Sequence, residues 1–183
     1  MRAMKPTTFF ALMTQGCLAS FMAVVVAHSG DAPAGPFALP ADYTTSLRRV
    51  SDTLFDEKTG LTTVFVNELA GSVRGFSQEK YPIGSVIAME FAQPQRDGEG
   101  ELLRAPGGQP LKGKIDYVAV MRRVAGFGGI YGDERAGEWE FSTYRPDGRV
   151  QIAPDKAVQC ASCHRKAGPD KDFVYRKRSW SAP

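Results

Sequence analysis

Cysteine and histidine are scarce in this chain, which has three cysteines and two histidines among 183 residues. A strong excess of charge of one sign is also absent, because the formal net charge is only +3. So small an imbalance gives no argument for a nucleic-acid partner, and no motif of interleaved aromatic and basic residues points to one. With 43% hydrophobic and 23% charged residues, the composition is that of a globular domain rather than a disordered chain.

Long hydrophobic runs are absent except close to the N-terminus. There, Arg2 and Lys5 precede a stretch of apolar and small residues (9–27), and residues rich in alanine, proline and glycine follow. A positive start, an apolar middle and a small-residue end are the pattern of a secretory signal peptide. The stretch is also long enough to cross a bilayer, so an N-terminal membrane anchor stays open as the alternative.

The signal peptide pattern predicts how the chain is organised. We expect a signal peptide over residues 1–27, with its cleavage site no later than residue 34, and a disordered leader over residues 28–40. One folded domain is then expected over residues 41–180. Its expected location is the periplasm.

Export changes which cysteines and histidines remain available. Cys17 leaves with the signal peptide, and His28 lies in the cleavage zone. What remains is the sequence CASCH, in which Cys160, Cys163 and His164 lie within five residues. The cysteine and histidine chemistry of the mature protein is therefore confined to this one motif.

The spacing of CASCH suits a haem. On an α-helix, which turns about 100° per residue, Cys163 lies about 60° behind Cys160 and His164 about 40° ahead of it. All three side chains therefore leave one face of the helix. In a C-x-x-C-H motif the two thiols attach haem c and the imidazole ligates its iron. Export agrees with this reading, because haem c is attached outside the cytoplasm.

Three other kinds of site are alternatives to a haem at this motif. A structural zinc site needs four ligands, and the mature chain offers two thiolates and one imidazole. A thioredoxin-like redox pair belongs at the start of a helix in a βαβ unit, and no such unit follows here. A plain disulfide between Cys160 and Cys163 is the third alternative. We therefore predict one covalently bound haem c, with His164 as the iron ligand.

The remainder of the chain shows short strand and helix patterns. Runs rich in β-branched and aromatic residues predict strands over residues 61–66, 85–93, 115–123 and 138–144. Spacing and capping residues predict helices over 41–55 (capped by Asp42), 67–76 (capped by Asn67) and 155–168 (from Asp155 to Gly168). Residues 94–114 and the glycine-rich residues 126–137 are predicted as connections, and residues 172–178 as a last strand or an extended tail. The elements indicate an α+β domain with an antiparallel sheet and a few short helices.

The sixth iron ligand separates two classes of function. Met89 and Met121 are the available soft ligands, although a methionine in a strand more often packs in a core. An iron with histidine and methionine ligands transfers electrons. An iron without a sixth ligand binds small gases or reacts with peroxide or nitrogen oxides.

The chain resembles the cytochrome P-460 family and its sheet-rich relatives, cytochrome c′-beta. The matching pieces span roughly residues 40–178. They are TTVFVNELA (62–70), YPIGSVIAMEF (81–91), IDYVAVMRR (115–123), GEWEFSTYRPDG (137–148), CASCH (160–164) and DKDFVYRKR (170–178). The late position of CASCH between the last two blocks makes the resemblance fairly specific.

The resemblance implies a mainly antiparallel sheet packed over one haem c, usually in a homodimer. It implies that Cys160 and Cys163 hold the haem, that His164 is the proximal ligand, and that the distal side is vacant or weakly occupied. In cytochrome P-460 itself a lysine cross-linked to the porphyrin goes with hydroxylamine oxidation. Here that position falls on Met89, and no lysine lies between Lys80 and Lys112. This departure weakens the expectation of hydroxylamine oxidation.

Strand alternation adds a candidate distal pocket. Ile87, Met89 and Phe91 lie on one face of their predicted strand. If that face lies over the haem, the pocket is apolar and has no general base, which suits neutral ligands such as nitric oxide. The alternative is that this face is ordinary core, and the pattern does not choose between the two.

Three functions follow from this reading. The first is binding of nitric oxide or a related small nitrogen-oxide ligand at an open iron. The second is an enzyme that oxidises hydroxylamine or nitric oxide, or reduces peroxide. The third is a periplasmic electron carrier. Basic residues near the C-terminus, among them Arg165 and Lys166, would dock an acidic redox partner or form a solvated surface.

Overall fold

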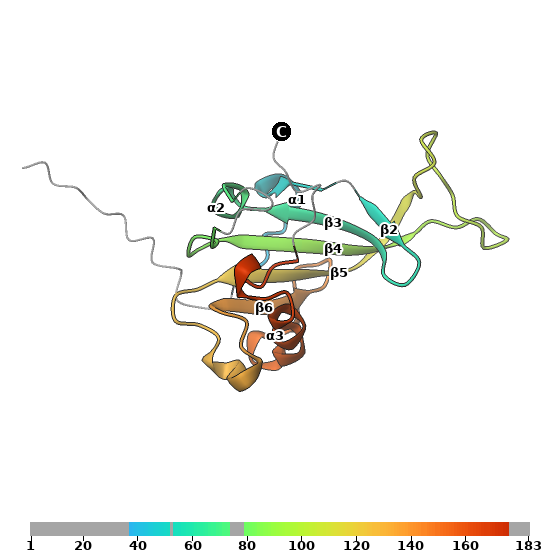
Figure 1. Ribbon diagram of the computed structural model, residues 1–183. Coiled ribbons are helices and arrows are strands. Elements are labelled where there is room, and N and C mark those ends of the chain that lie inside the picture. Colours follow the sequence, from blue (N-terminus) through green and yellow to red (C-terminus); the bar gives the residue numbers. More distant parts are fainter. Residues whose placement is uncertain (1–36, 52, 74–78, 176–183) are drawn as a thin grey trace, which may run out of the picture.

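The computed structural model describes residues 37–51, 53–73 and 79–175. These residues form a seven-stranded antiparallel sheet in the order β1-β3-β4-β5-β6-β7, with β2 also paired to β3 (Figure 1). The strands are β1 (Arg48–Arg49), β2 (Leu54–Asp56), β3 (Gly60–Val66), β4 (Val86–Pro94), β5 (Lys112–Arg123), β6 (Trp139–Tyr144) and β7 (Val150–Ile152). The α-helices are α1 (Tyr43–Ser46), α2 (Glu68–Gly71) and α3 (Val158–Arg165). Three short 3-10 helices are η1 (Gly129–Glu134), η2 (Pro154–Lys156) and η3 (Pro169–Lys171). The predicted α+β fold is confirmed.

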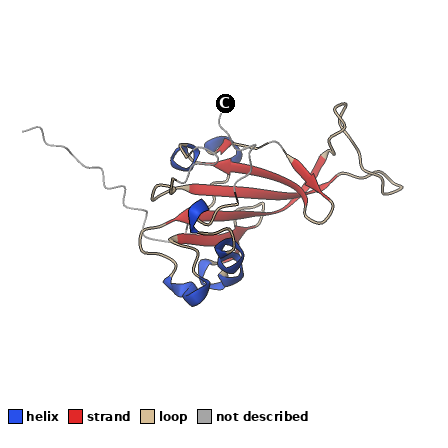
Figure 2. Ribbon diagram, viewed as in Figure 1, coloured by secondary structure: helices blue, strands red, loops and turns tan. Residues whose placement is uncertain are grey.

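The helices gather at two sides of the sheet. Helices α1 and α2 lie beside β3, while η1 and α3 lie beside β6 (Figure 2). Helix α3 contacts both β6 and η1, so the CASCH motif is held against the β5–β6 side of the sheet.

The central strands bury both of their faces. The register places Ile87, Met121 and Phe141 side by side across β4, β5 and β6, on the face that α3 covers. We call this side the α3 face. On the opposite side, which we call the α1 face, Ala88 and Val120 pack with Tyr43 and other residues of the segment around α1. Because side chains alternate along a strand, neighbouring residues of one strand belong to different cores.

The predicted helix over residues 41–55 is wrong beyond its first turn. Only Tyr43–Ser46 are helical, and β1 and β2 then pair with opposite ends of β3. Asp42 precedes the helix, but its side chain makes no capping hydrogen bond. Leu47 and Val50, which a helix would place on one side, pack in the two different cores. The helical pattern of this segment is only moderately strong. Hydrogen bonding of β1 and β2 to the free edge of β3 therefore stabilises the extended conformation more than the local pattern stabilises a helix.

The predicted central strands agree with β3, β4, β5 and β6 within a few residues. Asn67 caps α2 as expected, because its Oδ1 accepts a hydrogen bond from the Ala70 N–H at 3.0 Å. The same oxygen accepts from the Val86 N–H at 3.0 Å, which ties the helix start to β4. Helix α2 ends at Gly71, and residues 74–76 of the predicted helix lie outside the described residues.

The long connection between β4 and β5 projects from the sheet as an arm (Figure 1). It contains two isolated antiparallel bridges, between Arg96 and Leu102 and between Arg104 and Pro110. The glycine-rich connection over residues 126–137 contains η1, which is kinked at Gly132.

The C-terminal region differs from prediction in detail. Helix α3 begins at Val158 rather than Asp155, because Pro154–Lys156 form the separate 3-10 helix η2. Gly168 has a positive φ of 86° and turns the chain after the helix, as expected of a glycine near a helix end. The described part of residues 172–178 is a turn and not a strand, and residues 176–178 lie outside the described residues.

The predicted signal peptide and most of the predicted leader also lie outside the described residues. Within the part of the chain that the structure describes, no helix is long and apolar enough to cross a membrane.

Candidate functional site

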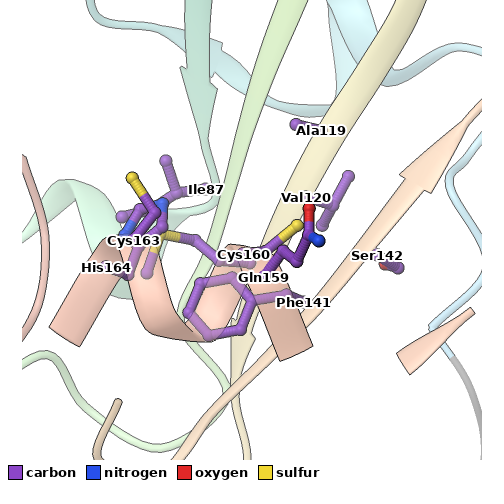
Figure 3. A pocket seen from close by; sticks show the side chains of 10 residues that line it. Ile87, Ala119, Val120, Phe141, Ser142, Gln159, Cys160, Cys163 and His164 are labelled. Atoms are coloured by element: carbon purple, nitrogen blue, oxygen red, sulfur yellow. The ribbon is translucent and has the colours of Figure 1, made fainter. Parts of the chain in front are cut away.

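Helix α3 and the sheet enclose a cavity of about 340 Å³ (Figure 3). Cys160, Cys163 and His164 line it from α3, as the helical spacing of the motif predicted. Strands β4, β5 and β6 contribute the opposite wall, which comprises Ile87, Ala119, Val120, Met121, Phe141 and Ser142. The fold therefore places the CASCH motif over a largely apolar hollow on the α3 face.

The His164 imidazole is held by a hydrogen bond to the main chain. Its Nδ1 lies 2.8 Å from the carbonyl oxygen of Phe173. A carbonyl only accepts hydrogen bonds, so Nδ1 carries the proton and Nε2 keeps its lone pair. Burial lowers the pKa of His164, and the hydrogen bond to Phe173 opposes this shift. The neutral tautomer with a free Nε2 is the form that binds a metal ion.

Two aromatic rings surround this imidazole. The Phe141 ring centroid is 4.9 Å from that of His164, and the Tyr175 ring meets the imidazole edge to face at 5.5 Å. The Tyr175 hydroxyl donates a hydrogen bond of 2.8 Å to the carbonyl oxygen of Cys163. That carbonyl lies in the last turn of α3, where main-chain acceptors lack helical partners. Tyr175 therefore stabilises the end of the helix and flanks the imidazole.

The two cysteines are free thiols. Cys160 is half-buried and Cys163 is exposed. Burial, followed by the nearby Cys163, raises the pKa of the Cys160 thiol. Redox-active cysteines have lowered pKa values instead, so the thioredoxin-like reading is disfavoured. Among the described residues, no cluster of three or more histidine, cysteine, aspartate or glutamate side chains is arranged to hold a metal ion.

The candidate distal residues take different positions along β4. Ile87 lines the cavity, together with Met121 of β5. Met89 packs in the same core but, among the described residues, is not part of the cavity wall. Phe91 lies farther along β4 and stacks on Tyr117 at 4.5 Å between ring centroids. Ile87 and Met121 are thus brought together with His164, whereas Met89 and Phe91 are not.

Sequence reasoning missed several residues of the site. Phe141 was identifiable in principle, because it is a large apolar residue in a predicted strand. The register of β5 and β6 then sets it beside Met121. The Phe173 carbonyl carried no such indication, since a main-chain acceptor has the same chemistry at every residue. Gln159, the neighbour of Cys160, also lines the cavity and adds one of its few polar groups.

The residues present fit a haem c. Two free thiols lie three positions apart, a neutral imidazole offers Nε2, and the opposing wall is mostly apolar. Cofactor sites commonly combine an apolar lining with a few placed polar groups. The donor set and the lining therefore agree with the chemistry that the motif predicted.

Comparison with known proteins agrees with this description. A search of curated proteins found no match. The profile of one family, described as Cytochrome P460, matches residues 40–176, which include every strand of the sheet and the CASCH motif. The resemblance seen in the sequence is thereby confirmed. The chain belongs to the cytochrome P460 family, and this membership implies that it binds haem c.

Proposed function

We propose that this protein is an exported mono-haem c cytochrome that binds nitric oxide or a related small nitrogen-oxide ligand at an open or weakly ligated iron. The observation that carries the proposal is the lining of the cavity beside His164. Apart from the motif's own Cys160, Cys163 and His164, the described lining residues include no titratable side chain. Such a lining admits a small neutral molecule and offers no general acid or base for multi-step chemistry.

The motif residues divide the work of holding the cofactor. Cys160 and Cys163 would hold the haem through two thioether bonds, and Nε2 of His164 would ligate its iron. When bound, the haem would supply an iron with a position for a small ligand. Burial favours the neutral imidazole, the Phe173 carbonyl orients it, and Ile87 and Phe141 place apolar side chains beside it.

An electron carrier is the second candidate, and one observation favours it. Met121 lines the cavity and is only 6% exposed, so its thioether lies on the same cavity as His164. A methionine ligand opposite the histidine would close the iron to gases and suit electron transfer.

Hydroxylamine oxidation has less support. In the resemblance to cytochrome P-460, the position of that protein's cross-linking lysine falls on Met89, and no lysine is found among the described residues that line the cavity. A peroxide-reducing or nitric-oxide-oxidising enzyme would similarly need a proton-transfer group that this lining does not contain.

The test is the optical spectrum of the haem-loaded full chain, ferric and dithionite-reduced, before and after addition of nitric oxide. A high-spin ferrous spectrum that shifts with nitric oxide supports the proposal. Sharp low-spin bands that ignore nitric oxide contradict it. If those bands disappear in Met121→Ala but persist in the matched Met89→Ala variant, the protein is an electron carrier with Met121 as ligand.

Two further variants test the attachment. His164→Ala is expected to lose the histidine-ligated spectrum, and an unchanged spectrum would refute His164 as the ligand. Cys160→Ala combined with Cys163→Ala is expected to release the haem on acid–acetone extraction, because no thioether remains.

Export and assembly belong to the same proposal. We expect the mature chain to begin between residues 28 and 35 in the periplasm, which N-terminal sequencing of the secreted protein checks. We also expect a homodimer, which light scattering of the haem-loaded protein would establish or refute.

A further inference from the structure

The chain that follows α3 has an unusual backbone conformation. After the 3-10 helix η3, Asp172 has a φ of 49° and Phe173 a φ of 61°. Within the described residues, these two are the only non-glycine residues with positive φ. Such conformations are disfavoured for residues with a side chain and persist only where the surroundings impose them.

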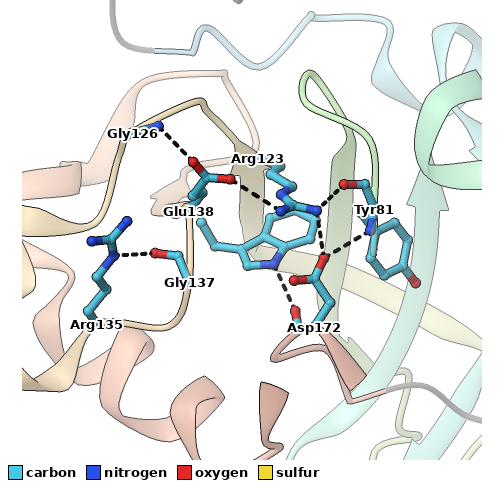
Figure 4. Close-up of polar contacts among 8 residues, drawn as sticks. Tyr81, Arg123, Gly126, Arg135, Gly137, Glu138 and Asp172 are labelled. Carbon is cyan, nitrogen blue, oxygen red and sulfur yellow. Dashed lines mark hydrogen bonds and ion pairs between the residues drawn. The ribbon is translucent and has the colours of Figure 1, made fainter. Parts of the chain in front are cut away.

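The contacts of Asp172 account for its positive φ. The residue is 4% exposed, and its Oδ2 accepts hydrogen bonds from the Tyr81 N–H at 2.9 Å and from Arg123 Nη1 at 3.0 Å (Figure 4). Its main-chain carbonyl accepts a third bond from the Trp139 indole N–H at 2.8 Å. We call Asp172, Arg123, Trp139 and Tyr81 the Asp172 clamp. The three partners of Asp172 come from β5, β6 and the segment before β4.

Arg123 is itself fixed at this place. Its guanidinium also donates to the Tyr81 carbonyl and pairs with Glu138 at 3.2 Å. Glu138 in turn accepts a hydrogen bond from the Gly126 N–H at 2.9 Å. The clamp is therefore anchored to β5 and, through Glu138, to the loop that follows β5.

The next residue, Phe173, has little freedom to move. Its N–H donates to the Gly168 carbonyl at 2.9 Å, and its ring lies against Gly137. A Cβ atom at position 137 would come within 2.8 Å of that ring. With the clamp on one side and this contact on the other, the Phe173 carbonyl points at Nδ1 of His164, 2.8 Å away.

We propose that Asp172 is a positioning residue for the haem ligand, because its clamp holds the Phe173 carbonyl on the imidazole of His164. The inference rests on the proposed function in requiring that His164 ligates the iron. A histidine that donates its second N–H to a carbonyl has a fixed ring and is a stronger ligand. Asp172 therefore sets the strength of iron ligation, and with it the reduction potential, without touching the cofactor.

The test compares the haem-loaded wild type with Asp172→Ala and with a matched control, Asp170→Ala. Asp170 is an exposed acidic residue in the same η3 turn. The readouts are the reduction potential and the iron–imidazole stretching band of the ferrous protein in resonance Raman spectra. We expect Asp172→Ala to raise the potential by about 59 mV, which is a tenfold loss in relative ligation of ferric iron. The iron–imidazole band should fall in frequency, and Asp170→Ala should match the wild type.

Two milder variants keep the proposal testable if Asp172→Ala does not fold or take up haem. Asp172→Asn keeps an acceptor for the Tyr81 N–H but loses the charge that binds Arg123, so an intermediate shift is expected. Trp139→Phe removes the indole N–H that donates to the Asp172 carbonyl, together with part of a fully buried ring, and should shift the potential in the same direction. If these variants lower the unfolding midpoint while potential and band stay at wild-type values, Asp172 is merely structural and the proposal is overturned.

The same measurements separate this inference from the proposed function. If His164→Ala retains the iron–imidazole band, the ligand assignment itself is wrong. If His164→Ala loses the band while every clamp variant behaves as the wild type, only the positioning role of Asp172 is refuted.

Discussion

On the α1 face, Arg122 and Glu140 lie opposite each other on β5 and β6, and both are almost fully buried. On the α3 face of the same two strands, Met121 and Phe141 border the cavity. The α1-face pair is joined by two hydrogen bonds of 2.8 and 2.6 Å from the guanidinium to Glu140 Oε2. The α3 face instead places apolar side chains opposite the free Nε2 of His164.

Glu90 is a third buried charged residue of the α1 face, and it too has partners within the chain. It is 1% exposed on the α1 face, where it accepts a hydrogen bond from the Tyr43 hydroxyl and pairs with Lys112. Buried charges are tolerated only when they are paired and hydrogen-bonded. The charged groups of the α1 face thus find their partners within the chain, whereas the ligand atoms of the α3 face meet a cavity. This contrast supports the proposal that the α3 face holds the ligand site, whereas the paired charges of the α1 face stabilise the fold.

Removing one partner of the α1-face pair is expected to have the largest effect. Arg122→Ala leaves Glu140 buried without its guanidinium and should lower the free energy of unfolding by about 3–5 kcal/mol in urea titrations. The double variant Arg122→Met with Glu140→Leu should be close to neutral, because it removes both charges and keeps the volume. Neither change should alter the haem spectrum. Equal destabilisation by the single and double variants would show that an unpaired charge is not the cause.

A matched pair on β5 compares the two faces directly. Met121→Ala and Val118→Ala each remove buried apolar atoms, on the α3 face and the α1 face respectively. We expect Met121→Ala to cost about 2 kcal/mol, the lower end for such changes, because the side chain already borders a cavity. Only Met121→Ala should change the rate at which nitric oxide dissociates, measured by stopped-flow absorbance, and the enlarged cavity should make it faster. Equal rates in both variants would argue against ligand binding at the α3 face.

The smallest expected effect is a change of pH dependence. Burial is the main cause that raises the pKa of Tyr131 to about 12. The hydrogen bond that the Tyr131 hydroxyl accepts from the Phe141 N–H lowers this pKa, but by less. Between pH 10 and pH 12 the unfolded chain releases this proton and the folded chain keeps it. Stability is therefore complete below about pH 10 and falls as pH rises, by at most about 1.4 kcal/mol per pH unit.

Tyr131→Phe should flatten this decline in urea titrations at several pH values. Tyr43→Phe should do the same on the α1 face, since burial and its hydrogen bond to Glu90 also raise the pKa of Tyr43. A decline in Tyr131→Phe that runs parallel to the wild type would refute the assigned cause.

The central strands β3 to β6 were predictable because their evidence is local, whereas β1, β2 and β7 were not predicted. The segments around Val64, Ile87 and Phe141 combine β-branched and aromatic residues with alternation, and such a pattern does not depend on what packs against it. The start of α2 was predictable for a similar reason, since the Asn67 side chain caps a main chain only three residues away. The segment after Ser46 was mispredicted because its conformation depends on pairing with the edge of β3. Nothing in the segment's own residues indicates that this edge is available.

The amino-acid sequence by itself determined the chemistry of this protein. The spacing of Cys160, Cys163 and His164 puts two thiols and an imidazole on one side of any helix that contains them, wherever that helix packs. Only the tertiary structure decided what that helix faces. Docking of α3 against β6 placed Met121 and Ile87, and not Met89, in the cavity wall, and the Asp172 clamp brought a carbonyl from nine residues away onto His164. Helical periodicity is a property of neighbouring residues, whereas the partners of a side chain are set by contacts between segments distant in sequence.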